Sequence, residues 1–568
     1  MANTYKHGAY AKIGASAAQN ATSTGTIAVY IGTAPVNLVQ EYSTKNVVNY
    51  PKKISNLLDA QKSVGYSDDW DKFTLCEAIA AHFDNKLGNI GPVYFINVLD
   101  PAVHKKAAET SKTLNFVNGS ASFISDTVIL DTVSITGKTA GTDFSVDYNF
   151  TTGKVIINSL EATPLSGNVE VKFFEIDLSN IDEDTIIGGV TSSGQYSGIG
   201  ALPLVYQELG KVPNLVLAPK WSENKKVYQK LCTAIQDIND QWDAFALADI
   251  PLEGEAETNI DIYSYSGDNT GTFYTAAAIA ADATAYSDRL LSKVIGTITA
   301  VTTTGDNPSV TIGTGNAESL TINGTVKKTV TTTVDTIEEA LAWKRTNAYD
   351  SERTKVFWPQ GYDGGTERIF HGSTLGCVEF LRADDNWKNV PAETCSNKEI
   401  PVTAQYFGAN ATNQGFDRVG ANNLNEYGIS TLFSDGGKLK LWGGHTAKYQ
   451  YGADDDPRCI FDTYMRMLMY CENQFQKRQG SKIDKPFNRG LRDSILTSEQ
   501  KQLDALVAVG ALIGEPKILF LASENSTEDL MTGDFKFDIP ITVAPQYKSS
   551  TAEVLYTDAG LSSLVEEG

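Results

Sequence analysis

The alternation of strand and helix patterns over residues 26–100 constrains the fold more than any other feature of the sequence. The run "TIAVYIGTA" at 26–34 is an apolar strand that ends in turn residues, and "GPVYFINVLDP" at 91–101 is a second continuous apolar strand. Strands that alternate with helices are typical of crossover units and a largely parallel sheet. The same pattern returns after residue 189, so we expect an α/β core that is interrupted by insertions.

Two helices are predicted between those strands. The first opens at Pro51 and carries Ile54, Leu57 and Leu58 at helical spacing. The second covers 70–83, "WDKFTLCEAIAAHF", whose apolar residues recur on one helical face.

Two stretches of the chain are rich in Thr, Val and Ile and carry strand patterns only. Residues 101–188 show turn signals such as "TTGK" about every ten residues, which is typical of a small sandwich or barrel. A shorter β-rich stretch covers 296–335. We expect both stretches to be all-β insertions.

The chain is therefore predicted to be an α/β and α+β multidomain protein, since its 568 residues are too many for one hydrophobic core. We expect an N-terminal arm (1–20), three segments of an α/β core (21–100, 189–295 and 336–455), an inserted β-sandwich-like domain (101–188), a second β-rich insertion (296–335), a C-terminal domain of helices and sheet (456–534) and a C-terminal strand and arm (535–568).

The composition excludes several classes of protein. A formal net charge of −22 argues against nucleic-acid binding, which favours a basic surface. No apolar run approaches the roughly twenty residues of a membrane span, and the first residues lack a signal-peptide pattern. The six cysteines are far apart and form no C-x-x-C pair, which is typical of free, mostly buried thiols. We expect an acidic protein that is made in a reducing cytoplasm and does not insert into a membrane.

Two further helices are predicted in the last third of the chain. One opens at Pro457 with Asp456 as its N-cap, and the other begins at Thr497, which would form a capping box with Gln500. The run "GADDDPR" at 452–458 also suggests a Mg²⁺ or Ca²⁺ site, because carboxylates are preferred ligands of these ions. Helix capping by Asp456 and its two acidic neighbours accounts for the same residues, so we predict no metal site.

No motif in the sequence carries recognisable catalytic chemistry. The run "TGKT" at 136–139 matches the end of a phosphate-binding loop, but position 132, where that loop needs a glycine, is threonine. We predict a turn there and no cofactor site. The five histidines form no H-E-x-x-H motif, and the chain has no G-x-S-x-G, so no catalytic residue is predicted.

Residues 471–492 form the most distinct charge feature. Six basic residues stand against Glu472 and Asp484, an excess of four positive charges; they are Lys477, Arg478, Lys482, Lys485, Arg489 and Arg492. We refer to them as the basic segment. It is either a docking surface for an acidic partner or a solvated helix end that favours the negative end of the helix dipole.

The C-terminal region contains two strand patterns. In "FKFDIPI" at 535–541, Phe535, Phe537, Ile539 and Ile541 point to one side, and Pro540 confines such a strand to a sheet edge. The run "TAEVLYT" at 551–557 is the second pattern.

Three segments together resemble the tail sheath proteins of contractile bacteriophages and related injection machines. They are "FTLCEAIAAHF" followed by "GPVYFINVLDP", then "TIEEALAWKRTNAYDSERTKVFWPQ", and finally "LNEYGISTLFSDGGKLKLWGGHTA" at 424–447. The last is the most specific, with a glycine turn at Gly436 and Gly437 ahead of "LWGGHTA".

The resemblance implies a structural protein and not an enzyme. Many copies are expected to form a helical homo-polymer of stacked rings around a tail tube, and to contract so that the tube is driven through a cell envelope. The implied partners are the tail tube, baseplate and tail terminator proteins, without nucleic acid. The implied location is the virion tail, assembled in the host bacterial cytoplasm. The basic segment is the candidate for contact with the tube.

The resemblance also implies that extended arms at both ends exchange strands between subunits. The candidate residues are Tyr10, Ile13, Phe535, Phe537, Ile539, Ile541, Val554 and Tyr556. The alternative is that both ends fold back onto their own subunit, because sequential strands usually pair locally. Two other classes stay open at this point. One is a β-rich surface adhesin or decoration protein of a virion, suggested by the insertions, and the other is an α/β hydrolase.

Overall fold

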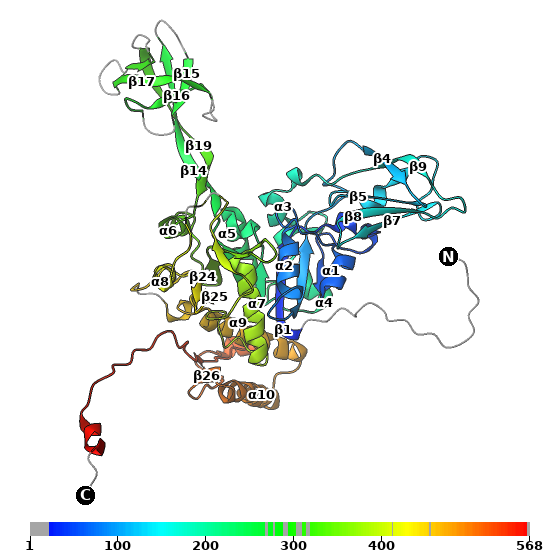
Figure 1. Cartoon of the computed structure of the whole chain (residues 1–568). Coiled ribbons are helices and arrows are strands. Elements are labelled where there is room, and N and C mark those ends of the chain that lie inside the picture. Colours follow the sequence, from blue (N-terminus) through cyan, green and yellow to red (C-terminus); the bar gives the residue numbers. More distant parts are fainter. Residues whose placement is uncertain are drawn as a thin grey trace, which may run out of the picture. The chain divides into compact units, whose positions relative to one another are not determined.

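The computed structural model describes residues 22–266, 271–275, 279–287, 293–302, 309–313, 318–409, 411, 413–453 and 456–564. Figure 1 labels its elements. The chain divides into two compact units. One contains the residues up to Ile250, Leu341–Tyr406 and the residues from Gln414 onward, and the other contains Pro251–Ala340 and Phe407–Asn413.

The larger unit is built on an eight-stranded sheet with the order β2-β3-β1-β12-β13-β20-β24-β25. Neighbouring strands from β3 to β24 are parallel, and only the outermost pairs, β2–β3 and β24–β25, are antiparallel. The predicted, largely parallel sheet is confirmed. The strands are β1 (Thr22–Gly32), β2 (Pro51–Ile54), β3 (Ile90–Asn97), β12 (Leu215–Leu217), β13 (Phe245–Asp249), β20 (Thr354–Phe357), β24 (Ile429–Asp435) and β25 (Lys438–Trp442).

The central strands are buried on both faces, as continuous apolar sequence predicts. Ala28, Val29, Tyr30 and Ile31 of β1 are all fully buried, which is typical of parallel strands covered by helices. Helices α2 (Thr74–Phe83) and α7 (Gly372–Asn386) pack against β1 and against each other. The other helices of this unit are α1 (Leu57–Ser63), α3 (Glu183–Ile187), α4 (Leu204–Leu209), α5 (Lys225–Ala234) and α8 (Arg418–Asn425).

The prediction of a helix that opens at Pro51 is wrong. Pro51 begins β2, an outer strand of the sheet, where the missing N–H of proline is tolerated. The helix begins only at Leu57, after Asn56, whose side chain accepts a hydrogen bond from Asp59 N at 2.9 Å. Leu58 is accordingly exposed and does not belong to an apolar face.

The strands of the first insertion lie between Thr110 and Phe173. The prediction of strands alone over 101–188 is wrong, because Leu130–Thr132 is a 3-10 helix and α3 lies within the predicted bounds. The strands of the insertion form two three-stranded sheets, β4-β9-β6 and β5-β8-β7, around a hydrophobic core of their own. "TGKT" lies in the turn after β6, where Gly137 has a φ of +72°, so the predicted turn is confirmed. The strands are β4 (Thr110–Phe116), β5 (Ser120–Ile124), β6 (Ser134–Ile135), β7 (Phe144–Asn149), β8 (Lys154–Ser159) and β9 (Gly167–Phe173).

The smaller unit contains a closed barrel of six strands, β14 to β19. The predicted boundary at 295/296 is wrong, because β14 pairs with β19 from Glu253 opposite Thr333 to Ser266 opposite Ser319. Figure 1 shows these two strands as a long ribbon that leads into the barrel. Residues 253–287 therefore belong to the β-rich insertion and not to the α/β core. The strands are β14 (Glu253–Ser266), β15 (Gly271–Thr275), β16 (Thr284–Tyr286), β17 (Val294–Thr302), β18 (Ser309–Ile312) and β19 (Glu318–Thr333), and α6 (Ile337–Thr346) follows.

The C-terminal helices exist as predicted but begin elsewhere. Helix α9 (Asp462–Gln479) starts five residues after Pro457, and Asp456 caps only the short 3-10 turn Pro457–Cys459. Asp454 and Asp455 lie outside the described residues. Helix α10 (Arg489–Ala508) is capped by Asn488, so the capping box predicted at Thr497 is wrong; that residue is inside the helix.

The remaining elements are short: α11 (Thr527–Thr532), β10 (Gly189–Val190), β11 (Tyr196–Ser197), β21 (Gln360–Asp363), β22 (Arg368–Phe370), β23 (Ala404–Tyr406), β26 (Leu512–Ile513) and β27 (Thr542–Val543). Among the described helices, none combines the length and the apolar character that crossing a membrane requires.

Candidate functional site

The segment that follows α11 lies against its own chain. Phe537, Ile539, Ile541 and Val543 pack on a hydrophobic cluster that includes Met467 of α9 and Leu503 of α10. Phe535 stacks on Phe487, with 3.8 Å between the ring centroids. The predicted alternation of side chains is present, but these residues, which were candidates for contacts between subunits, cover helices of their own subunit.

The backbone of this segment forms little sheet. Asp538 pairs with Leu519, and β27 pairs with β26 in a two-stranded sheet in which Leu512 lies opposite Val543. The prediction of a continuous strand over 535–541 is therefore wrong. Within the part of the chain that the structure describes, no third strand joins β26 or β27, so this small sheet has two open edges. An open edge is a template for strand addition.

The C-terminal tail is anchored at its beginning. Gln546 Nε2 donates to Ala392 O at 3.1 Å and to Thr463 Oγ1 at 3.0 Å. The Lys548 ammonium lies 5.7 and 5.9 Å from the ring centroids of Tyr449 and Tyr451, within the range of cation–π attraction.

Beyond Lys548 the tail exposes its apolar side chains. Val554 is 93% exposed, Leu555 73% and Tyr556 88%. Free apolar side chains at adjacent positions are unusual on a surface that contacts only water. The N-terminal candidates, Tyr10 and Ile13, lie outside the described residues.

The basic segment separates into paired and available charges. The Arg478 guanidinium binds Glu499, whose side chain is 2% exposed, at 2.5 Å. Arg489 and Arg492 share Asp493 at 3.8 and 2.7 Å. Arg478 is therefore neutralised by its own subunit, whereas Arg489 and Arg492 share a single negative charge.

The three lysines of the basic segment are different. Lys482 donates to the amide oxygen of Gln479 at 3.0 Å, and Lys477 and Lys485 are exposed. Among the described residues, none of the three lysines has a carboxylate within ion-pair distance. Most of the positive charge that is available to a partner therefore comes from Lys477, Lys482 and Lys485.

The "LWGGHTA" segment surrounds two buried lysines. Lys355 Nζ donates to Gly443 O at 2.7 Å and to His445 O at 3.2 Å, and it forms an ion pair with Asp462. Lys344 Nζ donates to Ala447 O at 2.6 Å, and burial lowers the pKa of Lys344 to about 8. Both lysines belong to the segment 336–360, which also carries the resemblance, but the sequence gave no sign that this segment contacts "LWGGHTA", about a hundred residues later.

The predicted glycine turn in the same segment is confirmed. Gly436 and Gly437 connect β24 to β25 with φ angles of +62° and +80°. Two consecutive positive φ angles suit a tight hairpin, and glycine adopts them without strain.

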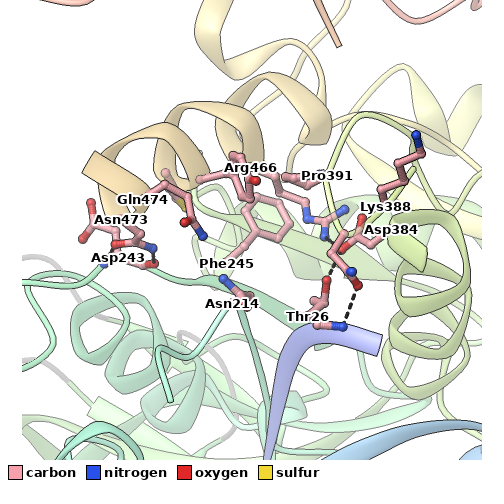
Figure 2. A pocket seen from close by; sticks show the side chains of 14 residues that line it. Thr26, Asn214, Asp243, Phe245, Asp384, Lys388, Pro391, Arg466, Asn473 and Gln474 are labelled. Atoms are coloured by element: carbon pink, nitrogen blue, oxygen red, sulfur yellow. Dashed lines mark hydrogen bonds and ion pairs between the residues drawn. The ribbon is translucent and has the colours of Figure 1, made fainter. Parts of the chain in front are cut away.

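A polar pocket of about 150 Å³ lies between the start of β1, the end of α7 and α9. Figure 2 shows Arg466, Asp384 and Thr26 toward one end, and Asp243 and Asn473 at the other. Arg466 binds Asp384 at 2.6 Å, and Thr26 Oγ1 donates to the same carboxylate at 2.8 Å. At the far end, Asn473 Nδ2 donates to Asp243 O at 2.7 Å. These contacts tie α9 to the core sheet.

Burial raises the pKa of all six cysteine thiols, so none of them is an activated nucleophile. All six cysteines are free and at least half-buried, and burial raises the pKa of Cys377 and of Cys395 to about 12. Burial lowers the pKa of His445 to about 4, and its Nδ1 faces Ile460 O at 2.7 Å. No group of three or more metal-ligating side chains occurs in the described residues, which do not include Asp454 and Asp455.

Comparison with solved structures finds several similar chains. A chain of the anti-feeding prophage baseplate is 12% identical with a TM-score of 0.49, over 98% of this chain and 99% of that one. A chain of the PVC sheath complex in the contracted state is 10% identical with a TM-score of 0.45, over the same shares. The sheath tail protein Lin1278 from Listeria innocua is 9% identical with a TM-score of 0.42, over 93% of this chain and 94% of that one.

No protein-family model matches the chain. The tail sheath protein of Burkholderia phage BcepMu is 24% identical to it over 561 residues, which cover 94% of this chain and 93% of the phage protein. The resemblance to tail sheath proteins predicted from the sequence is confirmed by this match along nearly the whole chain.

Proposed function

We propose that this chain is the structural subunit of a contractile tail sheath, which polymerises around a tail tube and contracts to drive the tube through a target cell envelope. The observation that carries the proposal is the similarity to a phage tail sheath protein over 94% of the chain. The proposed location is the tail of a virion or a related particle, assembled in the host bacterial cytoplasm. Its proposed partners are further copies of itself, the tube, the baseplate and the tail terminator.

The exposed tail supports strand exchange between subunits. Burying Val554, Leu555 and Tyr556 on a neighbour would contribute about 5–9 kcal/mol as an upper estimate. The open edges of the β26–β27 sheet are a suitable acceptor, because an added strand gains backbone hydrogen bonds there. Tyr10 and Ile13 of the N-terminal arm are proposed to take part in the same exchange.

The three available lysines of the basic segment are the proposed contact with the tube. Lys477, Lys482 and Lys485 would face an acidic outer surface of the tube, and complementary charge would guide and orient assembly. Arg478, Arg489 and Arg492, which were candidates for the same contact, are engaged with their own subunit.

The work of contraction is proposed to come from new contacts between subunits, without catalysis. An assembly whose interfaces have two alternative packings can store free energy in one and release it in the other. A rigid subunit suits this role, and the buried contacts of Lys355 and Arg466 hold α9 on the core sheet.

Negative-stain electron microscopy of the purified full chain, beside a variant that lacks residues 1–20 and 549–568, tests the proposal. The cut leaves Gln546 and Lys548 in place, so the base of the tail keeps its contacts. Tubes from the full chain and monomers from the trimmed variant are expected. Tubes from both proteins would support the sheath proposal and reject strand exchange. Single particles from both would reject the sheath and favour the adhesin alternative.

A further inference from the structure

A small polar notch adjoins the pocket of Figure 2. It has a volume of about 100 Å³ and lies between the loop that leads into β12 and the C-terminal half of α9. Lys211 and Asn214 stand on the loop side, and Gln474 and Lys477 stand on the helix side. Asn214 and Gln474 also line the pocket in Figure 2, so the two hollows adjoin each other.

Two ammonium groups and side-chain amides line this notch. Lys211 and Lys477 are exposed, and neither has an ion-pair partner among the described residues. Asn214 Oδ1 accepts from Ile27 N at 2.9 Å, which leaves its amide hydrogens to donate. Asn473 Oδ1 is likewise occupied, by Asp243 N at 3.1 Å. Two ammonium groups and an amide donor around one hollow fit a carboxylate.

The C-terminal tail has the complementary character. Residues 549–568 contain four acidic residues and no Lys or Arg. Glu553 and Asp558 flank the exposed Val554, Leu555 and Tyr556. A segment that carries carboxylates and no basic residue matches the two ammonium groups of the notch.

We infer that the notch between Lys211 and Lys477 binds a carboxylate of the C-terminal tail from a neighbouring copy of this chain. The inference rests on the strand exchange proposed above and adds to it a second, charged contact outside the β26–β27 sheet. It assigns Lys477 to the neighbouring tail and leaves Lys482 and Lys485 for the tube. Because the contact is electrostatic and exposed, it weakens as salt rises. It also speeds the capture of the tail, since opposite charges steer association.

A charge exchange between two variants of the full chain tests this inference. The first variant carries Lys211→Glu and Lys477→Glu, and the second carries Glu553→Lys and Asp558→Lys. Polymer formation without tube is followed by light scattering in low salt. Each variant alone should need at least a tenfold higher protein concentration to polymerise. An equimolar mixture should polymerise near the wild-type concentration, because each tail then meets a notch of opposite charge on the other chain.

The controls separate this inference from the sheath proposal. Lys225→Glu, on the exposed surface of α5, should polymerise like the wild type, and circular dichroism should show the same folded signal for every variant. Polymerisation of the lysine variant at the wild-type concentration would overturn the inference and leave the sheath intact. If the equimolar mixture does not polymerise near the wild-type concentration, the inference is overturned as well. If the wild type forms no polymer, the sheath proposal fails, and the binding of a labelled 549–568 peptide to the full chain and to the lysine variant then decides the inference by itself.

Discussion

Lys355 and Asp462 form an ion pair that is entirely removed from solvent: Nζ lies 2.7 Å from Oδ2, and neither side chain is exposed. Lys355 also donates to two carbonyls of the 442–447 segment, so all three ammonium hydrogens have partners. Asp462 accepts a further hydrogen bond from Thr394 Oγ1 at 2.7 Å and begins α9, where a negative charge favours the helix dipole. One pair therefore joins the core sheet, the "LWGGHTA" segment and the C-terminal helix.

Removing one partner of this pair should destabilise the subunit strongly. Lys355→Met leaves the Asp462 carboxylate buried without its counter-ion, and we expect a loss of about 3–5 kcal/mol in the free energy of unfolding. Urea unfolding followed by tryptophan fluorescence at pH 7 measures it. The double change Lys355→Met with Asp462→Leu should lose less than the two single changes together. A loss no greater than that of Lys225→Met, on the exposed surface of α5, would contradict the prediction.

The sequence predicted what depends on local periodicity. The parallel strands at 26–34 and 91–101 and the side-chain alternation at 535–541 follow from apolar spacing alone. Pairings between distant residues could not be predicted in this way. From its sequence, β14 was assigned to the α/β core. Its partner β19 ends at Thr333, far along the chain, so local spacing gave no sign of the pairing.

Weak local signals account for the helix errors. Asn488 caps α10, but the third residue of that helix is Leu491 rather than Glu or Gln, so the capping-box pattern is absent. The charge count of the basic segment stopped at Arg492, one residue before Asp493, and it left out Glu499 of α10, which pairs with Arg478 of α9. The Lys355–Asp462 pair spans 107 positions and has no sequence pattern at all.

Asp249 should make the subunit less stable as pH rises toward neutrality. Burial raises the pKa of Asp249 from 3.8 to about 7, although the nearby His371 opposes this. Because the native state binds the proton more tightly than the unfolded chain, the stabilisation is complete below pH 3.8 and is lost as pH rises through about 7.

The wild-type free energy of unfolding should therefore fall by up to about 4 kcal/mol between pH 4 and pH 7 because of Asp249. Asp249→Asn should remove this contribution to the pH dependence. Chemical unfolding at pH 4.5, 6 and 7.5 measures the slope. Asp240→Asn, at an exposed turn, serves as the matched control and should retain the wild-type slope. An unchanged slope in Asp249→Asn would reject the explanation.

His371 should also make the subunit less stable as pH rises, but at higher pH than Asp249 does. Burial lowers the pKa of His371, but Glu77 at 2.6 Å and Glu223 at 3.3 Å outweigh it and raise the pKa well above 6.5. The charged imidazole thus stabilises the fold fully below pH 6.5, and this contribution disappears as pH rises through the native pKa. His371→Gln should remove that dependence. The melting temperature of the variant should be equal at pH 7 and pH 9, whereas that of the wild type should be lower at pH 9. A parallel decline in both proteins would count against it.

Arg478 and Lys485 should have separable roles although both belong to the basic segment. Arg478→Glu places a second acid beside the buried Glu499 and should cost at least about 2 kcal/mol of subunit stability. Lys485→Glu changes an exposed residue and should leave the melting temperature unchanged, while it weakens co-sedimentation with the tube at low salt. Equal effects of the two changes in both measurements would contradict this division.

The apolar tail should be essential for polymerisation but not for the subunit itself. Val554→Asp with Tyr556→Asp alters side chains that are 93% and 88% exposed, so the free energy of unfolding should stay within about 0.5 kcal/mol of the wild type. The same change should abolish polymers, because two charges would have to be buried on the neighbouring subunit. Ser549→Asp with Ser550→Asp adds equal charge to the tail without removing apolar surface, and it should still polymerise. Sedimentation velocity separates monomer from polymer for both variants. Polymers from the Val554→Asp, Tyr556→Asp chain would show that subunits are linked by surfaces of the folded units and not by this tail.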